Sequence, residues 1–180
     1  MVATAPTEID SERDLYFMQL AIEQAKAAEK LGEVPVGAVA VYNNEVIGQG
    51  HNQVITSLDP SAHAEVLALR EAAKNLGNYR LGEVTLYVTL EPCSMCAGLM
   101  VHSRIQRLVF AARDAKSGAA GSVFNITHNS ILNHQVTITE GLCAAECSTL
   151  LSSFFKERRA AKKRLRQLGK LNTQDPNTPE

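Results

Sequence analysis

A histidine, a glutamate and two cysteines near the middle of the chain restrict what this sequence can fold into. Glu65 follows His63 by two residues, and Pro92 introduces the pair Cys93 and Cys96. One imidazole and two thiolates suit zinc, and a site with three protein ligands keeps the fourth tetrahedral position for water, as catalytic zinc sites require. The spacing therefore predicts a catalytic zinc site, with Glu65 beside the metal rather than bound to it.

The places of the three ligands in the chain support the same prediction. Cys93 and Cys96 follow a proline and fit the first turn of a helix, where unpaired N–H groups favour the thiolate. His63 comes early in a second predicted helix, so two helix starts would converge on one ion. Zinc can lower the pKa of its water from about 15.7 to about 7. Glu65 is then placed to shuttle the protons.

Each half of the motif also has a simpler explanation. A lone CxxC pair is often structural or redox-active, and a lone H-x-E rarely carries function. A structural zinc site needs a fourth cysteine or histidine, and none follows Cys96 before His102, which we place at the end of the same helix. The combination therefore favours catalysis. Cys143 and Cys147 share a face of a later predicted helix, and core packing explains them better than a metal or redox role.

The motif H-x-E…P-C-x-x-C resembles the known signature of the zinc nucleobase deaminases. Cytidine, guanine and other deaminases share that signature. Five accompanying segments are more specific, because they are similar to those of the tRNA-specific adenosine deaminase family. They are "EVPVGAV" (33–39), "NYRL" (78–81), "TLYVTLEPCSMCAG" (85–98), "ARDAKSGAAGS" (112–122) and "FFKERR" (154–159).

The resemblance implies an α/β fold, a three-layer α/β/α sandwich around a central mixed five-stranded sheet. It also implies hydrolytic deamination of adenosine to inosine at the anticodon wobble position of tRNA. The cofactor would be one Zn²⁺ per subunit of a homodimer, and the partner the tRNA anticodon stem-loop. The family's zinc ligands correspond to His63, Cys93 and Cys96, and its catalytic acid and base corresponds to Glu65.

Ten further residues are assigned to substrate binding by the resemblance alone. Asn52 corresponds to a base-contacting asparagine, although an asparagine there also suits a turn. Three residues correspond to the walls of the pocket: Glu33, Val36 and Leu90. Three lie in a rim loop that faces the RNA: Asp114, Lys116 and Ser117. Three lie in a C-terminal helix that contacts the anticodon loop: Phe155, Arg158 and Arg159. Core packing is the alternative for Val36 and Leu90, and ordinary loop chemistry for the rim.

Periodicity and turn signals predict the order of the secondary-structure elements. Asn43 and Asn44 are expected to form a hairpin turn, whereas 124–135 fits no element. The expected helices are 11–30, one that starts near His63, one that starts near Cys93, and 142–169; the expected strands are 34–42, 45–49, 83–90, 105–111 and 136–139. Alternating strands and helices predict a mixed sheet covered on both faces, which agrees with the implied fold.

The chain of 180 residues is expected to form a single domain. We place one zinc-dependent deaminase domain over 11–170, ending in a basic helix. Disordered tails are expected at 1–10 and 171–180 because of their polar composition. No apolar run approaches the roughly 20 residues of a membrane span. The N-terminus lacks the basic and then apolar pattern of a secretory signal, so we expect a cytoplasmic protein.

Positive charge is concentrated near the C-terminus. Eight of the 18 basic residues lie between Lys156 and Lys170, against one acid, Glu157. Such a run is often only a solvated helix face, but its density favours a polyanionic partner.

Two other functions fit parts of the pattern. A zinc deaminase of a free base or nucleoside, of the guanine or cytidine type, would share the zinc site but have little use for a basic C-terminal helix. A non-catalytic, zinc-stabilised RNA-binding module would use the helix. It would not need Glu65, and it would be expected to have a fourth metal ligand.

Overall fold

The computed structural model describes residues 8–172, with side chains from 12 to 167. The outer parts of the two predicted tails, 1–7 and 173–180, lie outside the described residues. Helix α1 spans Glu8–Lys30 and begins slightly before the predicted start at 11, and helix α4 spans Ala144–Asn172. No helix within 8–172 has the length and apolar character needed to cross a membrane.

Five strands form one mixed sheet in the order β2-β1-β3-β4-β5. The sheet has antiparallel pairs β1/β2 and β1/β3 and parallel pairs β3/β4 and β4/β5, which confirms the predicted mixed sheet. Asn43 and Asn44 have φ of 49° and 65°, as a two-residue hairpin turn requires. The strands are β1 Gly37–Tyr42, β2 Glu45–His51, β3 Thr85–Leu90, β4 Arg107–Ala112 and β5 Thr137–Glu140.

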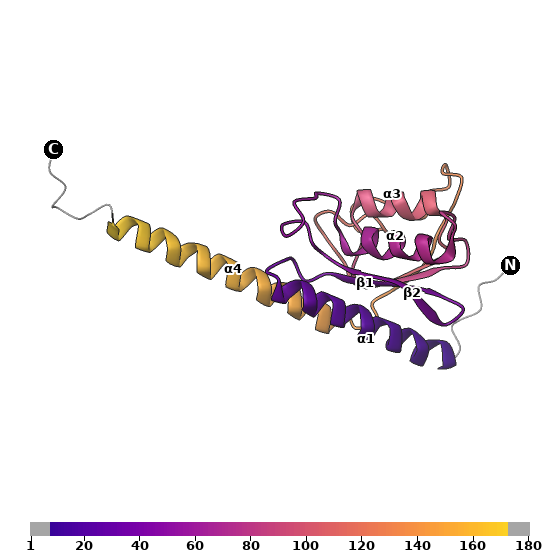
Figure 1. Ribbon diagram of the computed structural model, residues 1–180, viewed down its shortest axis with the longest axis horizontal. Helices are drawn as coiled ribbons and strands as arrows, with labels where there is room; N and C mark the ends of the chain where they lie inside the picture. The colour runs from indigo at the N-terminus through magenta and orange to yellow at the C-terminus, as the bar shows by residue number, and fades with distance from the viewer. Residues whose placement is uncertain (1–7, 173–180) are drawn as a thin grey trace.

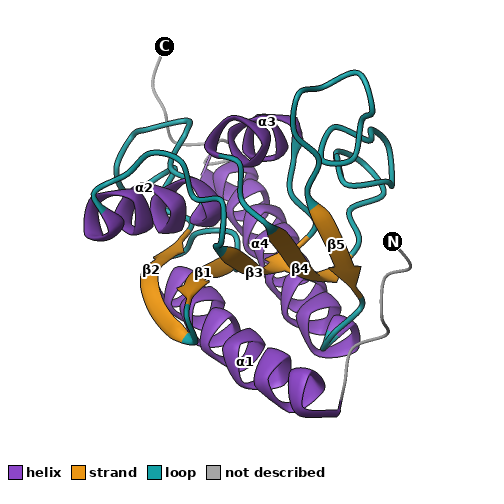
Figure 2. Ribbon diagram, turned by 90° about the vertical axis from the view of Figure 1, so that its right-hand side faces the viewer, coloured by secondary structure: helices purple, strands orange, loops and turns teal. Residues whose placement is uncertain are grey.

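Helices cover both faces of the sheet, so the molecule has three layers. Helices α2 (Ala64–Leu76) and α3 (Ser94–Ser103) lie on one face, and α1 and α4 on the other (Figures 1 and 2). Side chains along each inner strand alternate between two cores: Leu86 and Val88 pack with α2 and α3, whereas Tyr87 packs with α1. This arrangement confirms the implied α/β/α sandwich.

The backbone of α2 lies directly on strand β2. A Cβ at Gly50 would come within 2.6 Å of the Ala64 carbonyl oxygen, and one at Gly48 would overlap the backbone of α2 at Ala68. Only glycine therefore allows this approach. The consequence for function is that the first turn of α2, next to His63, is held at a fixed height over the sheet.

Several element boundaries differ from the sequence expectations, and two differences have a clear physical cause. The first strand begins at Gly37 rather than at residue 34, because Pro35 interrupts the run and the Val36 N–H turns back to the Val34 carbonyl. Cys143 precedes α4 with a φ of 59° and is only half-buried, so it does not share a helix face with Cys147. Cys147 is 1% exposed in the core against α1, as the packing explanation predicted.

Helix α4 leaves the body of the protein part-way along its length (Figure 1). Among the described side chains of α4, Phe154 is the last that is buried, and every one from Phe155 to Gln167 is exposed. At the point of departure, the Arg158 guanidinium donates a hydrogen bond of 2.9 Å to the Gly32 carbonyl and lies 5.6 Å from the centre of the Phe154 ring. The helix is therefore anchored beside the end of α1 and then projects into solvent.

Candidate metal centre and active-site pocket

Three ligand atoms from two helix starts meet below the pocket. His63 is the N-cap of α2, Cys93 is the N-cap of α3, and Cys96 lies in the first turn of α3. Neither residue makes a side-chain capping hydrogen bond to the backbone of its helix, so both side chains are free to face the metal position. His63 Nδ1 is 3.7 Å from Cys93 Sγ and 3.6 Å from Cys96 Sγ, and the two sulfurs are 3.7 Å apart. The predicted convergence of two helix starts is thus present.

This triangle has the size that tetrahedral zinc requires. Zn–S bonds of about 2.3 Å and Zn–N bonds of about 2.0–2.1 Å place tetrahedral sulfur atoms about 3.8 Å apart and sulfur and nitrogen about 3.6 Å apart. The observed separations match both values. Among the described residues, these three form a cluster whose ligand atoms all lie within 4.8 Å of one another. The donor set and its geometry therefore fit zinc with one coordination position left open.

The two cysteines differ in acidity. A hydrogen bond from the Cys96 thiol, with His63 nearby, lowers the pKa of Cys93 to about 4. The pKa of Cys96 is raised because its thiol donates that bond and is buried beside Glu65. Cys93 is therefore a thiolate at neutral pH, and a metal would take the place of the proton shared between the sulfurs.

Glu65 lies in the first turn of α2, lines the pocket and is 4% exposed. It does not belong to the cluster of metal ligands. Burial raises the pKa of its carboxyl group, because removal from water disfavours the charged form. A carboxyl group with a raised pKa beside an open metal position is suited to accept a proton and return it.

A pocket of about 340 Å³ opens above these groups, which lies within the range of small-ligand sites. Most residues predicted for the site contribute to its lining. They are Glu33, Val36, Asn52, His63, Glu65, Leu90, Cys93, Asp114 and Ser117. Cys96 is completely buried beneath them.

Four further residues line the pocket and were not predicted from the sequence. Val34, Val54, Ile55 and Glu91 also contribute to the wall. Val34 and Glu91 stand inside segments that carry the family resemblance, but neither residue type indicates a pocket. Val54 and Ile55 lie in the loop after β2, where no pattern predicts that the chain turns back over the site.

Asn52 occupies a restricted position in the pocket wall. Its Oδ1 accepts a hydrogen bond of 2.9 Å from the Ala64 N–H, and the side chain is 8% exposed. Because the oxygen is engaged with the helix start, the amide NH₂ is the group that can donate to a ligand. Asn52 therefore supports the start of α2 and also has a position suited to contact a base.

Glu33 shapes the neighbouring rim of the pocket. One of its carboxylate oxygens accepts hydrogen bonds of 2.7 Å from the N–H groups of both Ile55 and Thr56. The side chain is 1% exposed. Its place in the wall agrees with the prediction, and its contacts define it as the support of the 53–57 loop.

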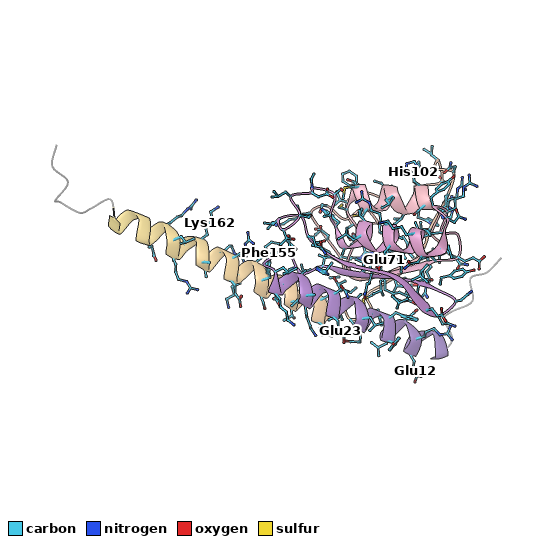
Figure 3. All side chains as sticks on the ribbon, viewed as in Figure 1. Glu12, Glu23, Glu71, His102, Phe155 and Lys162 are labelled. Carbon is cyan, nitrogen blue, oxygen red and sulfur yellow. The ribbon has the colours of Figure 1, made fainter. Side chains whose placement is uncertain are left out.

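Four predicted substrate residues do not line the pocket. Lys116 is exposed on the loop after β4, and Phe155, Arg158 and Arg159 lie on α4. Figure 3 shows Phe155 where α4 leaves the body and Lys162 on the projecting part. Arg158 bonds to Gly32, next to Glu33 in the sequence, so α4 passes close to one rim of the pocket.

A buried carboxyl group beside a three-ligand zinc site, on a mixed sheet with two helices on each face, defines a zinc-dependent deaminase. Residues 11–112 match the family described as the cytidine and deoxycytidylate deaminase zinc-binding region. The chain is 54% identical over 157 residues to the tRNA-specific adenosine deaminase of Haemophilus influenzae, covering 87% of this chain and 91% of that protein. It is 47% identical over 155 residues to that of Bacillus subtilis, covering 86% and 96%.

A solved structure has the same fold. It belongs to a study of A-to-I editing by deaminases at the wobble position of transfer RNA, and it matches with a TM-score of 0.73 and 39% identity, covering 76% of this chain and 99% of that one. The chain belongs to the tRNA-specific adenosine deaminase family, within the cytidine and deoxycytidylate deaminases.

Proposed function

We propose that this protein deaminates adenosine to inosine at the anticodon wobble position of a tRNA. The observation that carries the proposal is the buried Glu65 beside the open zinc site, at the floor of a pocket large enough for one base. The relatives named above support tRNA as the substrate. The alternative of a free-base deaminase leaves the projecting basic part of α4 without a function.

Proton transfer falls to Glu65. Zinc held by His63, Cys93 and Cys96 would act as a Lewis acid and lower the pKa of water towards neutral pH. Glu65 takes a proton from the water that attacks C6 and returns it to the ring nitrogen. It then takes the remaining proton of the new C6 hydroxyl group and gives it to the departing amine, so that adenosine and water become inosine and ammonia. Its burial keeps the protonated form accessible between these transfers.

The pocket wall orients the base. Val36 and Leu90 offer apolar surfaces, and the Asn52 amide NH₂ can donate to a ring nitrogen. A base stacked in the anticodon loop cannot reach the floor, so it must be extruded into the pocket. Asp114, Lys116 and Ser117 then lie at the mouth, where flanking nucleotides would pass.

Helix α4 provides the positive surface for the RNA backbone. Phe155 is 43% exposed and can stack on an unpaired base, and Arg159 is exposed beside it. The projecting part adds further exposed cations to hold phosphates: Lys156, Lys162, Lys163, Arg164 and Arg166. Arg158, which the resemblance also assigned to RNA, contributes by fixing the helix to Gly32.

The same proposal includes a homodimer in the cytoplasm. An apolar depression of about 280 Å³ is lined by residues of α2 and α3, the two helices that lie on the sheet face opposite α4 (Figures 1 and 2). Leu69, Leu99 and Tyr79 contribute to it, and Tyr79 is 68% exposed. An apolar surface near the Cys96 helix supports the interface implied by the family resemblance. Sedimentation of the purified protein should show a dimer.

The direct test is inosine formation in a synthetic anticodon stem-loop with a wobble adenosine. Free adenosine, cytidine and guanine serve as competing substrates, and zinc content is measured on the same sample. We expect conversion of the stem-loop alone. Turnover of only a free base or nucleoside would reject the RNA substrate, and no turnover in a fully zinc-loaded sample would favour the binding module.

A further inference from the structure

The loop that follows β4 forms one side of the pocket mouth. This rim loop, residues 113–122, carries Asp114 and Ser117, which line the pocket. It contains no helix or extended strand, and its β-pairing with neighbouring segments is limited to isolated bridges. Its shape must therefore be fixed by contacts other than a regular backbone ladder.

One buried carboxylate, that of Glu91, provides four of those contacts, in addition to the bonds that the Asp114 carboxylate accepts from Lys116 and Ser117. Glu91 follows strand β3 and is 2% exposed. Its Oε2 accepts hydrogen bonds from the Asp114 N–H at 2.9 Å and from the Ser122 hydroxyl. Its Oε1 accepts from the Ala120 N–H at 3.1 Å and from the Ser122 N–H at 3.0 Å. Each oxygen thus receives two donors, and all four come from the rim loop.

The loop also packs closely around this side chain. A Cβ at Gly118 would overlap the Glu91 carboxylate and lie 2.6 Å from the Asp114 carbonyl oxygen. The next residue, Ala119, donates its N–H to the Pro92 carbonyl at 2.8 Å. The rim loop therefore encloses the carboxylate and is aligned with the segment that leads to the metal ligand Cys93.

We propose that Glu91 is a positioning residue that holds the rim loop in the shape in which Asp114 and Ser117 meet the substrate at the pocket mouth. The proposal rests on the proposed function, because it takes those two residues to face the RNA. Glu91 acts through the loop, because both of its carboxylate oxygens are engaged by loop donors. Its loss should affect substrate binding more than the chemical step.

The substitution Glu91→Gln isolates this role with almost no change in volume. In either orientation, the amide NH₂ would face two donors that now meet a carboxylate oxygen. At least one of the four hydrogen bonds is then lost, because only the Ser122 hydroxyl can reverse and accept from the amide NH₂, and the site is buried, where unpaired donors are costly. Zinc binding should be unaffected, because none of the four bonds involves a metal ligand.

The experiment measures zinc content, kcat and KM for the stem-loop, and hydrogen exchange of the loop amides in the full chain. For Glu91→Gln we expect a full complement of zinc, a KM raised at least about tenfold and a kcat lowered less than about threefold. The amides of Asp114, Ala120 and Ser122 should exchange faster. Unchanged KM and exchange would overturn the proposal, as would zinc loss parallel to the loss of activity.

Glu71→Gln is the matched control. Glu71 also accepts a backbone hydrogen bond, from the Gln49 N–H at 2.7 Å, but it is exposed on α2 and does not line the pocket. KM and exchange in the rim loop should stay at the values of the unmodified protein. A rise in KM equal to that of Glu91→Gln would show a general effect of removing a carboxylate and would overturn the assignment.

Ser122→Ala keeps the test decisive if Glu91→Gln does not fold. This variant removes one of the four hydrogen bonds and keeps the Ser122 N–H. KM should rise about two- to fivefold with unchanged zinc, and an unchanged KM would contradict the proposal. If the unmodified protein does not deaminate the stem-loop, the proposed function fails, while the exchange measurement still tests whether Glu91 holds the loop.

Discussion

The pocket floor is buried and fixed by packing, whereas the projecting part of α4 is exposed to solvent. On the floor, Cys96 and Glu65 are buried, and His63 and Cys93 are fixed at the starts of two helices packed on the sheet. Beyond Phe154, α4 exposes every described side chain. Metal binding and proton transfer need atoms fixed within fractions of an ångström, whereas phosphate binding needs mainly charge. The comparison predicts rate losses from changes in the floor and affinity losses from changes in the helix.

Removal of a metal ligand should have the largest effect. Cys93→Ser or His63→Ala leaves two protein ligands, so we expect zinc to be lost, activity to fall to background and Tm to fall. Metal analysis and thermal melting of the same preparations check this. Retention of stoichiometric zinc by either variant would contradict the assignment of the floor.

Loss of the catalytic carboxyl group should come next. Glu65→Ala should retain zinc, because Glu65 is outside the ligand cluster, and lower kcat by about 10²–10⁴-fold. Zinc content and single-turnover rates separate this variant from the ligand variants. A rate within a few-fold of the unmodified enzyme would remove Glu65 from its role.

Neutralisation of the projecting helix should have a smaller effect of a different kind. Replacing Lys162, Lys163 and Arg166 by glutamine should raise KM for the stem-loop about tenfold and reduce the slope of log Kd against log salt by about two. Lys26→Gln, an exposed change on α1, is the control and should alter neither quantity. An unchanged slope would show that these cations do not contact phosphates.

The smallest effects should distinguish two adjacent arginines. Arg158→Ala breaks the hydrogen bond to Gly32 and should lower Tm by about 2 °C, because an exposed contact contributes little. Arg159→Ala should leave Tm unchanged and weaken RNA binding about two- to fivefold. Thermal melting and titration with the stem-loop measure both, and a reversal of the two patterns would refute the anchoring role of Arg158.

The parts that the sequence predicted correctly depend on local patterns. The hairpin at Asn43 and Asn44, the succession of strands and helices along the chain, and the two helix starts with their ligands all follow from residue types a few positions apart. The supports of the pocket could not be predicted in this way. Glu91 reaches residues 23 to 31 positions away, and Arg158 reaches a carbonyl 126 positions away. Such contacts exist only after the sheet has brought distant segments together.

Single-turnover deamination across a range of concentrations of zinc-loaded enzyme, always in excess over the stem-loop RNA, tests most directly whether the pocket floor sets the rate and α4 sets the affinity. The unmodified protein, Glu65→Ala and the triple variant of Lys162, Lys163 and Arg166 are compared. We predict that the triple variant reaches the unmodified rate at saturation but needs about ten times more enzyme. Glu65→Ala should stay slow at every concentration. A triple variant that remains slow at saturation would show that α4 takes part in the chemical step and would contradict the account.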